Sequence, residues 1–128
     1  METQPVYRRV LVKLSGEALG GTDGIFDNAR LEEICAQLKR VADLGTEVAV
    51  VIGAGNIWRG ARQAGLHIDR VRGDHMGMLA TVINSLAVQD YLLKAGLETE
   101  VLSAIPMAQV CGVYDQYKAD ALLRAGKA

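Results

Sequence analysis

The sequence predicts an α/β domain with a mainly parallel central sheet. Two apolar segments, at residues 7–14 and 47–52, have the β-branched composition of strands, and a helical pattern at residues 28–43 separates them. Strand, helix, strand is a βαβ unit, in which the strands lie parallel and the crossover is right-handed. The second segment is almost continuously apolar, which is typical of a strand buried on both faces of a parallel sheet.

The composition is that of one globular domain, or part of one. The chain has 128 residues, of which 50% are apolar and 23% charged, and its formal net charge is −1. Such a balance gives no electrostatic basis for binding nucleic acid or an anionic membrane. Because no segment reaches the ~20 consecutive apolar residues of a membrane span, and the N-terminus has no leader pattern, we expect a cytoplasmic protein without a membrane partner.

The first helix is framed by turn and capping residues. Residues 15–26 contain four glycines, which predicts a mobile loop before the helix. Asp27 or Asn28 is expected to cap the helix, and Gly45 to end it. Cys35 falls on the apolar face of this helix, so we expect it to behave as a small buried hydrophobic residue.

The elements after the second strand are a short helical stretch, a long helix, a strand and a final helix. The long helix is predicted at about residues 75–95, with Asp74 as its N-cap. Its apolar residues cover most of the circumference, which indicates burial on more than one side, including against another subunit. Residues 100–102 are predicted as a third strand, and residues 115–124 as a helix.

The most informative segment is the turn Gly53-Ala54-Gly55-Asn56, directly after the second strand. Glycines allow a tight turn with exposed N–H groups, and a helix beginning there would direct its positive end at an anion. Arg59 adds a fork of donors suited to phosphate. Neither the dinucleotide fingerprint nor the P-loop pattern is present. A structural turn without a ligand explains the glycines about as well, but the arginine favours an anion site.

The first strand ends in related chemistry, at Lys13-Leu14-Ser15-Gly16. A lysine near the carboxyl end of a parallel strand is expected to point into the cleft where such sheets bind ligands. There it would neutralise charge on a transferred phosphoryl group. A lysine that snorkels from an edge strand is nearly as good an explanation. Asp74 likewise has two explanations, as a helix cap or as an acceptor for sugar hydroxyls.

Three segments together resemble the bacterial uridylate (UMP) kinases of the amino-acid kinase superfamily. They are residues 13–19, 51–60 and 73–81, with a weaker match at 103–107. The block from Asp74 to Thr81 is specific to uridylate kinases. The resemblance covers essentially the whole chain and implies a three-layer αβα sandwich of the carbamate kinase-like type. It also implies transfer of the ATP γ-phosphoryl group to UMP, with magnesium, in pyrimidine nucleotide biosynthesis.

The resemblance further implies the site residues. Lys13 and Arg59 would be catalytic, and UMP would be held by the backbone of Ala54 and the carboxylate of Asp74. No residue is assigned to a metal ion; the cofactor would be ATP with Mg²⁺. The residues implied in ATP binding are Lys13, Leu14, Ser15, Gly16, Gly55 and Arg59.

Regulation and assembly are also suggested by the resemblance. The loop of Gly21, Thr22, Asp23, Gly24 and Ile25 matches a region linked to GTP regulation, and family members form hexamers built from dimers. GTP and UTP are the implied effectors.

Two departures from the family pattern bear on these expectations. Ala54 stands where the family usually has glycine; a positive φ there would cost roughly 1–2 kcal/mol, whereas a negative φ would make alanine harmless. Gln89, Leu93 and Glu100 stand where GTP-activated relatives carry basic residues, which argues against activation by GTP.

By this resemblance, residues 1–128 are the N-terminal, UMP-binding part of a single amino-acid kinase domain whose C-terminal half is absent. The chain alone is therefore expected to be inactive. Two alternatives remain open. One is another kinase of the superfamily, acting on a carboxylate or carbamate. The other is a truncated, non-catalytic module that binds a nucleotide weakly or only assembles with itself.

Overall fold

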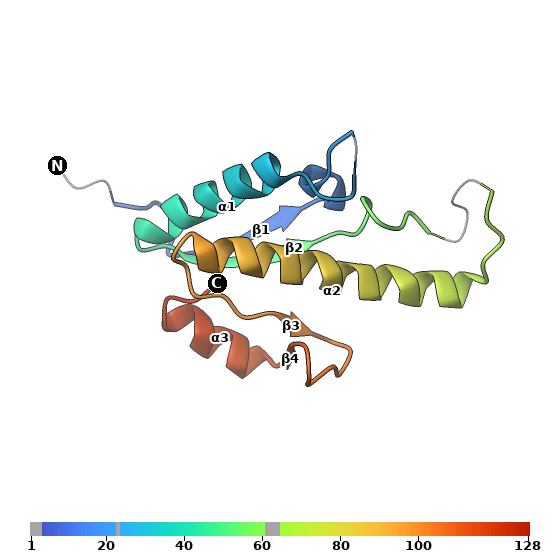
Figure 1. The fold of residues 1–128 in the computed structure, drawn as a ribbon. Helices are drawn as coiled ribbons and strands as arrows, with labels where there is room; N and C mark the ends of the chain where they lie inside the picture. The colour runs from blue at the N-terminus through green and yellow to red at the C-terminus, as the bar shows by residue number, and fades with distance from the viewer. Residues whose placement is uncertain (1–3, 23, 61–64) are drawn as a thin grey trace.

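A computed structural model describes residues 4–22, 24–60 and 65–128 (Figure 1). The predicted βαβ unit is confirmed and consists of β1 (Arg9–Leu14), α1 (Asn28–Asp43) and β2 (Glu47–Ile52). The two strands are parallel, and each residue of β1 lies opposite one of β2 without a break. The carboxyl ends of both strands therefore meet at one edge, which places the two predicted turns side by side.

The other elements follow these in order. They are the 3₁₀ helix η1 (Gly16–Leu19), α2 (Arg70–Lys94), β3 (Leu102–Ser103), β4 (Gly112–Val113) and α3 (Gln116–Arg124). β3 and β4 pair in parallel as a second, two-residue sheet. The predicted third strand thus lies slightly later than expected, and its partner β4 was not predicted, because a two-residue strand carries no readable alternation.

The helices cover the β1–β2 pair from both sides (Figure 1). α1 and α2 pack on each other and on the face formed by Val10, Val12 and Val48. Arg9 lies on the opposite face of β1 and bonds Asp120 of α3, with 2.8 Å between Nη1 and Oδ1. α3 therefore lies towards the other side of the sheet. This arrangement agrees with the predicted αβα sandwich in truncated form.

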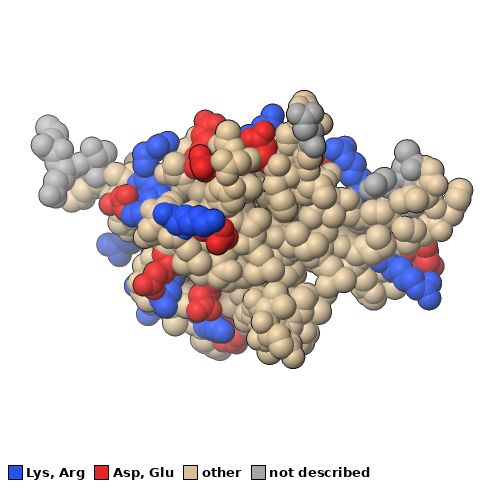
Figure 2. Space-filling view, in the orientation of Figure 1, with Lys and Arg blue, Asp and Glu red and all other residues tan. Residues whose placement is uncertain are grey.

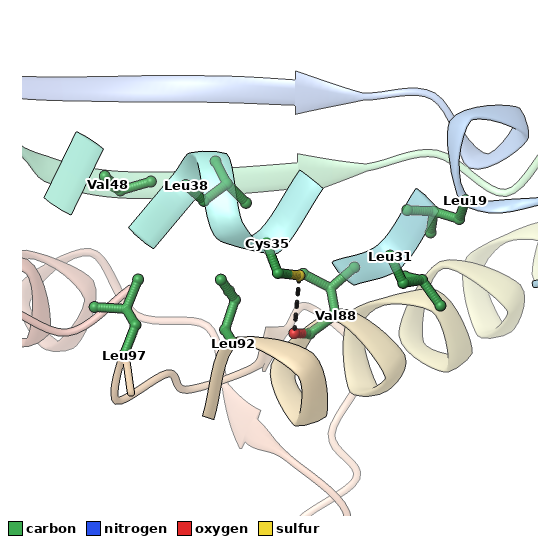
Figure 3. Close-up of a cluster of buried hydrophobic side chains, with 8 residues drawn as sticks. All are labelled: Leu19, Leu31, Cys35, Leu38, Val48, Val88, Leu92 and Leu97. Atoms are coloured by element: carbon green, nitrogen blue, oxygen red, sulfur yellow. Dashed lines mark hydrogen bonds between the residues drawn. The ribbon is translucent and has the colours of Figure 1, made fainter. Parts of the chain in front are cut away.

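The core lies between α1, α2 and β2 (Figure 3). Leu31, Cys35 and Leu38 recur every three to four residues and present one buried stripe of α1. α2 contributes Val88 and Leu92, and both are almost completely buried. The Cys35 Sγ lies 3.9 Å from the Val88 carbonyl oxygen, so the thiol joins the two helices. The expected burial of Cys35 is confirmed.

The start of α2 differs from the prediction. Its N-cap is Asp69, whose side chain accepts from Arg72 N at 3.3 Å, and Asp74 lies inside the helix, exposed. The prediction was wrong because aspartate is an equally good cap at both positions. Residues 70–73 continue the helix, and Gly73 costs only about 0.5–1 kcal/mol relative to alanine.

A short helix after β2 is also not found within residues 53–60. The chain forms a turn there instead, and both Ile57 N and Trp58 N donate to Ala54 O at 2.9 Å. The expected helix N-terminus directed at an anion is therefore absent from the described part of this segment. Its place is taken by the turn's own N–H groups.

By length and composition alone, α2 could cross a bilayer. An 18-residue window of this 25-residue helix has a mean hydropathy of 1.2, so the expectation that no segment of the chain could span a membrane does not hold on these criteria. A core helix of a water-soluble domain meets the same criteria. Because α2 packs against α1 and β2, we interpret it as part of the α/β core.

A cavity of about 280 Å³ lies along the side of β2 that is not paired with β1. Four consecutive residues, 49–52, line it, so the cavity touches an edge of the strand rather than one face. Ala128 lies at this cavity: its N–H donates to Glu98 O, and Glu100 N donates to Ala128 O, both at 2.9 Å. This is the hydrogen-bond pattern of a parallel ladder, with Ala128 beside Thr99.

The two cysteines provide a test of the core. Burial raises the pKa of the Cys35 thiol from 9.0 to about 11, whereas Cys111 is only partly buried. We expect one fast-reacting thiol, Cys111, when the folded chain is treated with a disulfide reagent at mildly alkaline pH. Because the unfolded thiol ionises first, the free energy of unfolding should also fall as pH rises above the ordinary thiol pKa.

The control is Cys111→Ser, which should leave no fast thiol until denaturant is added. Two fast thiols in the folded wild-type chain would contradict the packing of Cys35 between α1 and α2.

Candidate functional site

The turns after β1 and β2 meet at the carboxyl edge of the strand pair. Gly53 N donates to Leu14 O at 2.9 Å. A Cβ atom at Gly16 would lie 2.5 Å from both Gly55 N and the Asn56 side-chain oxygen, so only glycine fits there. The two predicted phosphate segments are thus in direct contact.

The second turn offers unpaired backbone donors. Among the described residues, no hydrogen-bond acceptor is found for the N–H groups of Ala54 and Gly55, although the Glu17 carboxylate lies beside Gly55. Every described non-glycine residue has a negative φ, so Ala54 fits without strain in place of the family's glycine. Consecutive free N–H groups in a turn bind anions, and the turn therefore has the chemistry of a phosphate site.

Arg59 connects the two turns. Its Nε donates to Gly55 O at 3.1 Å, and its Nη2 lies 3.4 Å from Oε1 of Glu17 in η1. The side chain is nevertheless 66% exposed. A phosphate group at the turn could share the guanidinium, although the Glu17 carboxylate partly offsets its charge.

Lys13 and Ser15 lie at the first turn, and no side-chain hydrogen bond or ion pair among the described residues joins them to the second turn. Lys13 is exposed on the face of β1 that also carries Leu11, opposite Val51 of β2. It makes no ion pair or hydrogen bond with the rest of the described chain, so the structure does not bring it onto Arg59. Ser15 precedes η1 without a side-chain capping bond, and its carbonyl accepts from Ala18 N at 3.1 Å.

Asp74 lies on α2, and no hydrogen bond or ion pair among the described residues joins it to the second turn. One helical turn later, a Cβ atom at Gly77 would lie 3.5 Å from the Trp58 ring. Residues three apart share a helix face, so Asp74 lies on the same face of α2 as Gly77, which is the face next to Trp58. The carboxylate is exposed there, and its assignment to UMP remains a prediction.

The glycine-rich loop before α1 is tied to the same turn. Gly21 N donates to Gly24 O at 3.3 Å, and Ile25 O accepts from Asn56 Nδ2 at 3.1 Å. Thr22 is exposed, and Asp23 lies outside the described residues. The predicted regulatory loop is thus bonded to the candidate phosphate turn.

Asn84 was missed by sequence reasoning. It lies on α2, is completely buried, and donates through Nδ2 to Gly53 O at 2.8 Å. The signal was present: an amide stands among the small and apolar residues of the buried helix stripe, and buried polar groups need partners. Its partner could not be read from the sequence.

Metal ligands show no comparable grouping. No set of three His, Cys, Asp or Glu side chains placed to hold a metal ion occurs among residues 4–22, 24–60 and 65–128. The described candidate site consists of backbone N–H groups and an arginine, which are donors suited to a phosphate group.

Known proteins are similar to this chain both in sequence and in fold. The chain is 46% identical over 123 residues to the uridylate kinase of Haemophilus influenzae, covering 95% of this chain and 52% of that protein. It is 50% identical over 128 residues to the uridylate kinase of Brucella anthropi, covering 99% and 53%.

Solved structures agree. The UMP kinase of Bacillus anthracis superimposes with a TM-score of 0.87 at 42% identity, covering 94% of this chain and 50% of that one. The UMP kinase of Ureaplasma parvum gives 0.88 at 31% identity, covering 95% and 54%. The chain thus spans about half the length of the relatives it matches.

The sequence model of the amino acid kinase family matches residues 8–127, nearly the whole chain. The resemblance drawn from the glycine turns and the Asp74–Thr81 block is therefore confirmed, and the chain belongs to the amino acid kinase family.

Proposed function

We propose that this chain is the UMP-binding part of a UMP kinase, which transfers the γ-phosphoryl group of ATP to UMP. The observation that carries the proposal is the pair of unpaired N–H groups at Ala54 and Gly55, beside Arg59, at the carboxyl edge of two parallel strands. Ligands bind at that edge in open α/β sheets. The identity of the proposed substrate, UMP, is taken from the relatives named uridylate kinase.

The chemistry required is positioning and charge stabilisation, because phosphoryl transfer needs little covalent work from the protein. The N–H groups of the turn would donate to phosphoryl oxygens, and Arg59 would add a charged fork. Lys13 would approach as a point charge, and Asp74 would accept from ribose hydroxyls. Mg²⁺ bound to the ATP phosphates would supply further charge neutralisation.

We also propose that the 128 residues form part of one larger domain. The chain covers about half of each relative, and the edge of β2 beside the cavity has no strand paired to it among the described residues. An additional parallel strand beside Ala128 would fill this edge. Without the remainder of the domain, we expect the chain to bind nucleotide weakly and to be inactive.

Assembly, regulation and location are further proposals by similarity. Met76, Leu79 and Ile83 recur along one exposed stripe of α2, and Figure 2 shows a largely uncharged band over this helix. Such a surface supports a homo-oligomer, proposed as a hexamer built from dimers. We propose a cytoplasmic enzyme of pyrimidine nucleotide biosynthesis, with GTP and UTP as candidate effectors.

Phosphoryl transfer from ATP–magnesium to UMP, CMP and AMP tests the proposal directly. We expect turnover on UMP by a version extended to the relatives' length, and none by the 128-residue chain. Turnover by the short chain would contradict its being an incomplete catalyst. A folded extended protein that phosphorylates a carboxylate or carbamate instead of UMP would establish the alternative kinase reading.

Arg59→Lys in the extended enzyme isolates the role of the guanidinium fork. Lysine keeps the charge but cannot bond Gly55 O and a phosphoryl oxygen in the same plane. We expect kcat with UMP to fall by about 10²–10³-fold. Arg40→Lys, on the exposed end of α1, is the matched control. Equal loss in both variants, or no loss at Arg59, would remove Arg59 from the site.

Extending the chain past Ala128 tests the open edge of β2. An apolar extension of strand character is expected to raise the unfolding midpoint in denaturant, because it pairs beside Thr99 and covers the cavity. The control extension carries proline at alternate positions, which removes the ladder donors. The same midpoint for both extensions would show that no strand adds there.

A further inference from the structure

We propose that Asn56 and Asn84 are positioning residues that fix the direction of the Ala54 N–H in the candidate phosphate turn. The identity of the ligand rests on the function proposed above. The positioning role of Asn56 and Asn84, called the amide lock below, rests only on geometry. The proposed function and the amide lock can therefore fail separately.

The two amides bond each other reciprocally. Asn84 Nδ2 donates to Asn56 Oδ1 at 2.8 Å, and Asn56 Nδ2 donates to Asn84 Oδ1 at 3.1 Å. The second donor of each amide reaches a backbone carbonyl: Gly53 O for Asn84, at 2.8 Å, and Ile25 O for Asn56, at 3.1 Å. All four side-chain N–H donors are therefore used.

This network joins three parts of the chain that are far apart in sequence. Asn84 belongs to α2, Asn56 to the turn after β2, and Ile25 to the glycine-rich loop before α1. Asn84 is completely buried, so its amide has no water to replace a lost partner. A fully satisfied buried network of this kind fixes a single arrangement of its members.

The bond to Gly53 O has a specific consequence. Gly53 C=O and Ala54 N–H belong to one peptide unit, and the described chain has no cis peptide bond. In a trans peptide these two groups point in opposite directions. Because Asn84 holds the carbonyl on α2, the Ala54 N–H is directed away from α2, as a donor that no described residue occupies.

Loss of this bond would allow the peptide unit to rotate. Gly53 has no side chain to resist such a rotation. The rotated unit would present a carbonyl oxygen, which repels phosphate, where the N–H had been. Asn84 therefore supports anion binding without touching the ligand.

Asn84→Asp is the sharpest test, because it keeps the shape of the side chain but places a carboxylate against Gly53 O. Its matched control is Gln89→Glu, the same amide-to-acid change later in α2. The Gln89 Nε2 donates to Thr99 O at 2.9 Å. Asn56→Ala, at the less buried end of the lock, provides a second variant if Asn84→Asp fails to fold.

Two measurements need no ligand. Trp58 is the only tryptophan, is almost buried, and donates its backbone N–H to Ala54 O, so its fluorescence follows the turn. Amide exchange at residues 24–27 follows the glycine-rich loop. We expect Asn84→Asp to shift the emission, and Asn84→Asp and Asn56→Ala to speed exchange, relative to Gln89→Glu. Unchanged emission and exchange in both lock variants would overturn the proposal.

A third measurement follows the Ala54 and Gly55 amide resonances during titration with UMP and with inorganic phosphate. Asn84→Asp is expected to weaken binding by about tenfold to a hundredfold, and Gln89→Glu to leave it unchanged. If the wild-type chain binds neither ligand, the proposed function fails while the fluorescence and exchange results still decide on the lock. Equal affinity of wild type and Asn84→Asp would refute the positioning role.

Discussion

Parallel, in-register pairing of β1 with β2 is the constraint on which the candidate site depends. It brings the two strand ends to one edge, so that the turn at Gly16 lies against the turn at Gly53–Asn56. Their separation is too small for any side chain at residue 16. Because the backbones are this close, Gly16 lies directly beside the N–H of Gly55, and the edge has backbone donors suited to a small anion.

A second constraint comes from the buried amide of Asn84. A helix can slide or rotate over apolar side chains at modest cost, but a buried amide must keep its partners. Asn84 therefore fixes how α2 lies over the turn. That orientation directs Gly77 to the Trp58 ring and leaves the stripe of Met76, Leu79 and Ile83 exposed. Asn84, a buried polar residue outside the apolar core cluster, thus ties α2 to the turn that carries the candidate site.

Sequence reasoning succeeded where the signal is local. The bounds of β2 follow from the residues of the strand itself, and the cap of α1 is Asp27, one of the two neighbouring residues predicted for it, which accepts from Arg30 N at 3.0 Å. The start of α2 was ambiguous because two aspartates cap equally well. The partners of Asn84 lie 28 and 31 residues away, so only the tertiary fold could reveal them. The site's turns were predictable, but the group that orients them was not.

The division of chemistry within the chain also bears on what the proposed part of a larger domain can and cannot do. The α1–α2–β2 core is built wholly from described residues of this chain, which is why the turns can be preorganised here. Charge is scarcer: the guanidinium of Arg59 is shared with Glu17, and Lys13 lies on a face of β1 that also exposes Leu11. Two backbone donors and one shared arginine can hold a phosphate, but stabilising a transferring phosphoryl group requires more positive charge than they provide. Under the proposed function, the additional charge would come from the nucleotide's own metal ion and from the remainder of a longer enzyme, and this requirement makes a binding role for the short chain compatible with catalysis by a longer one.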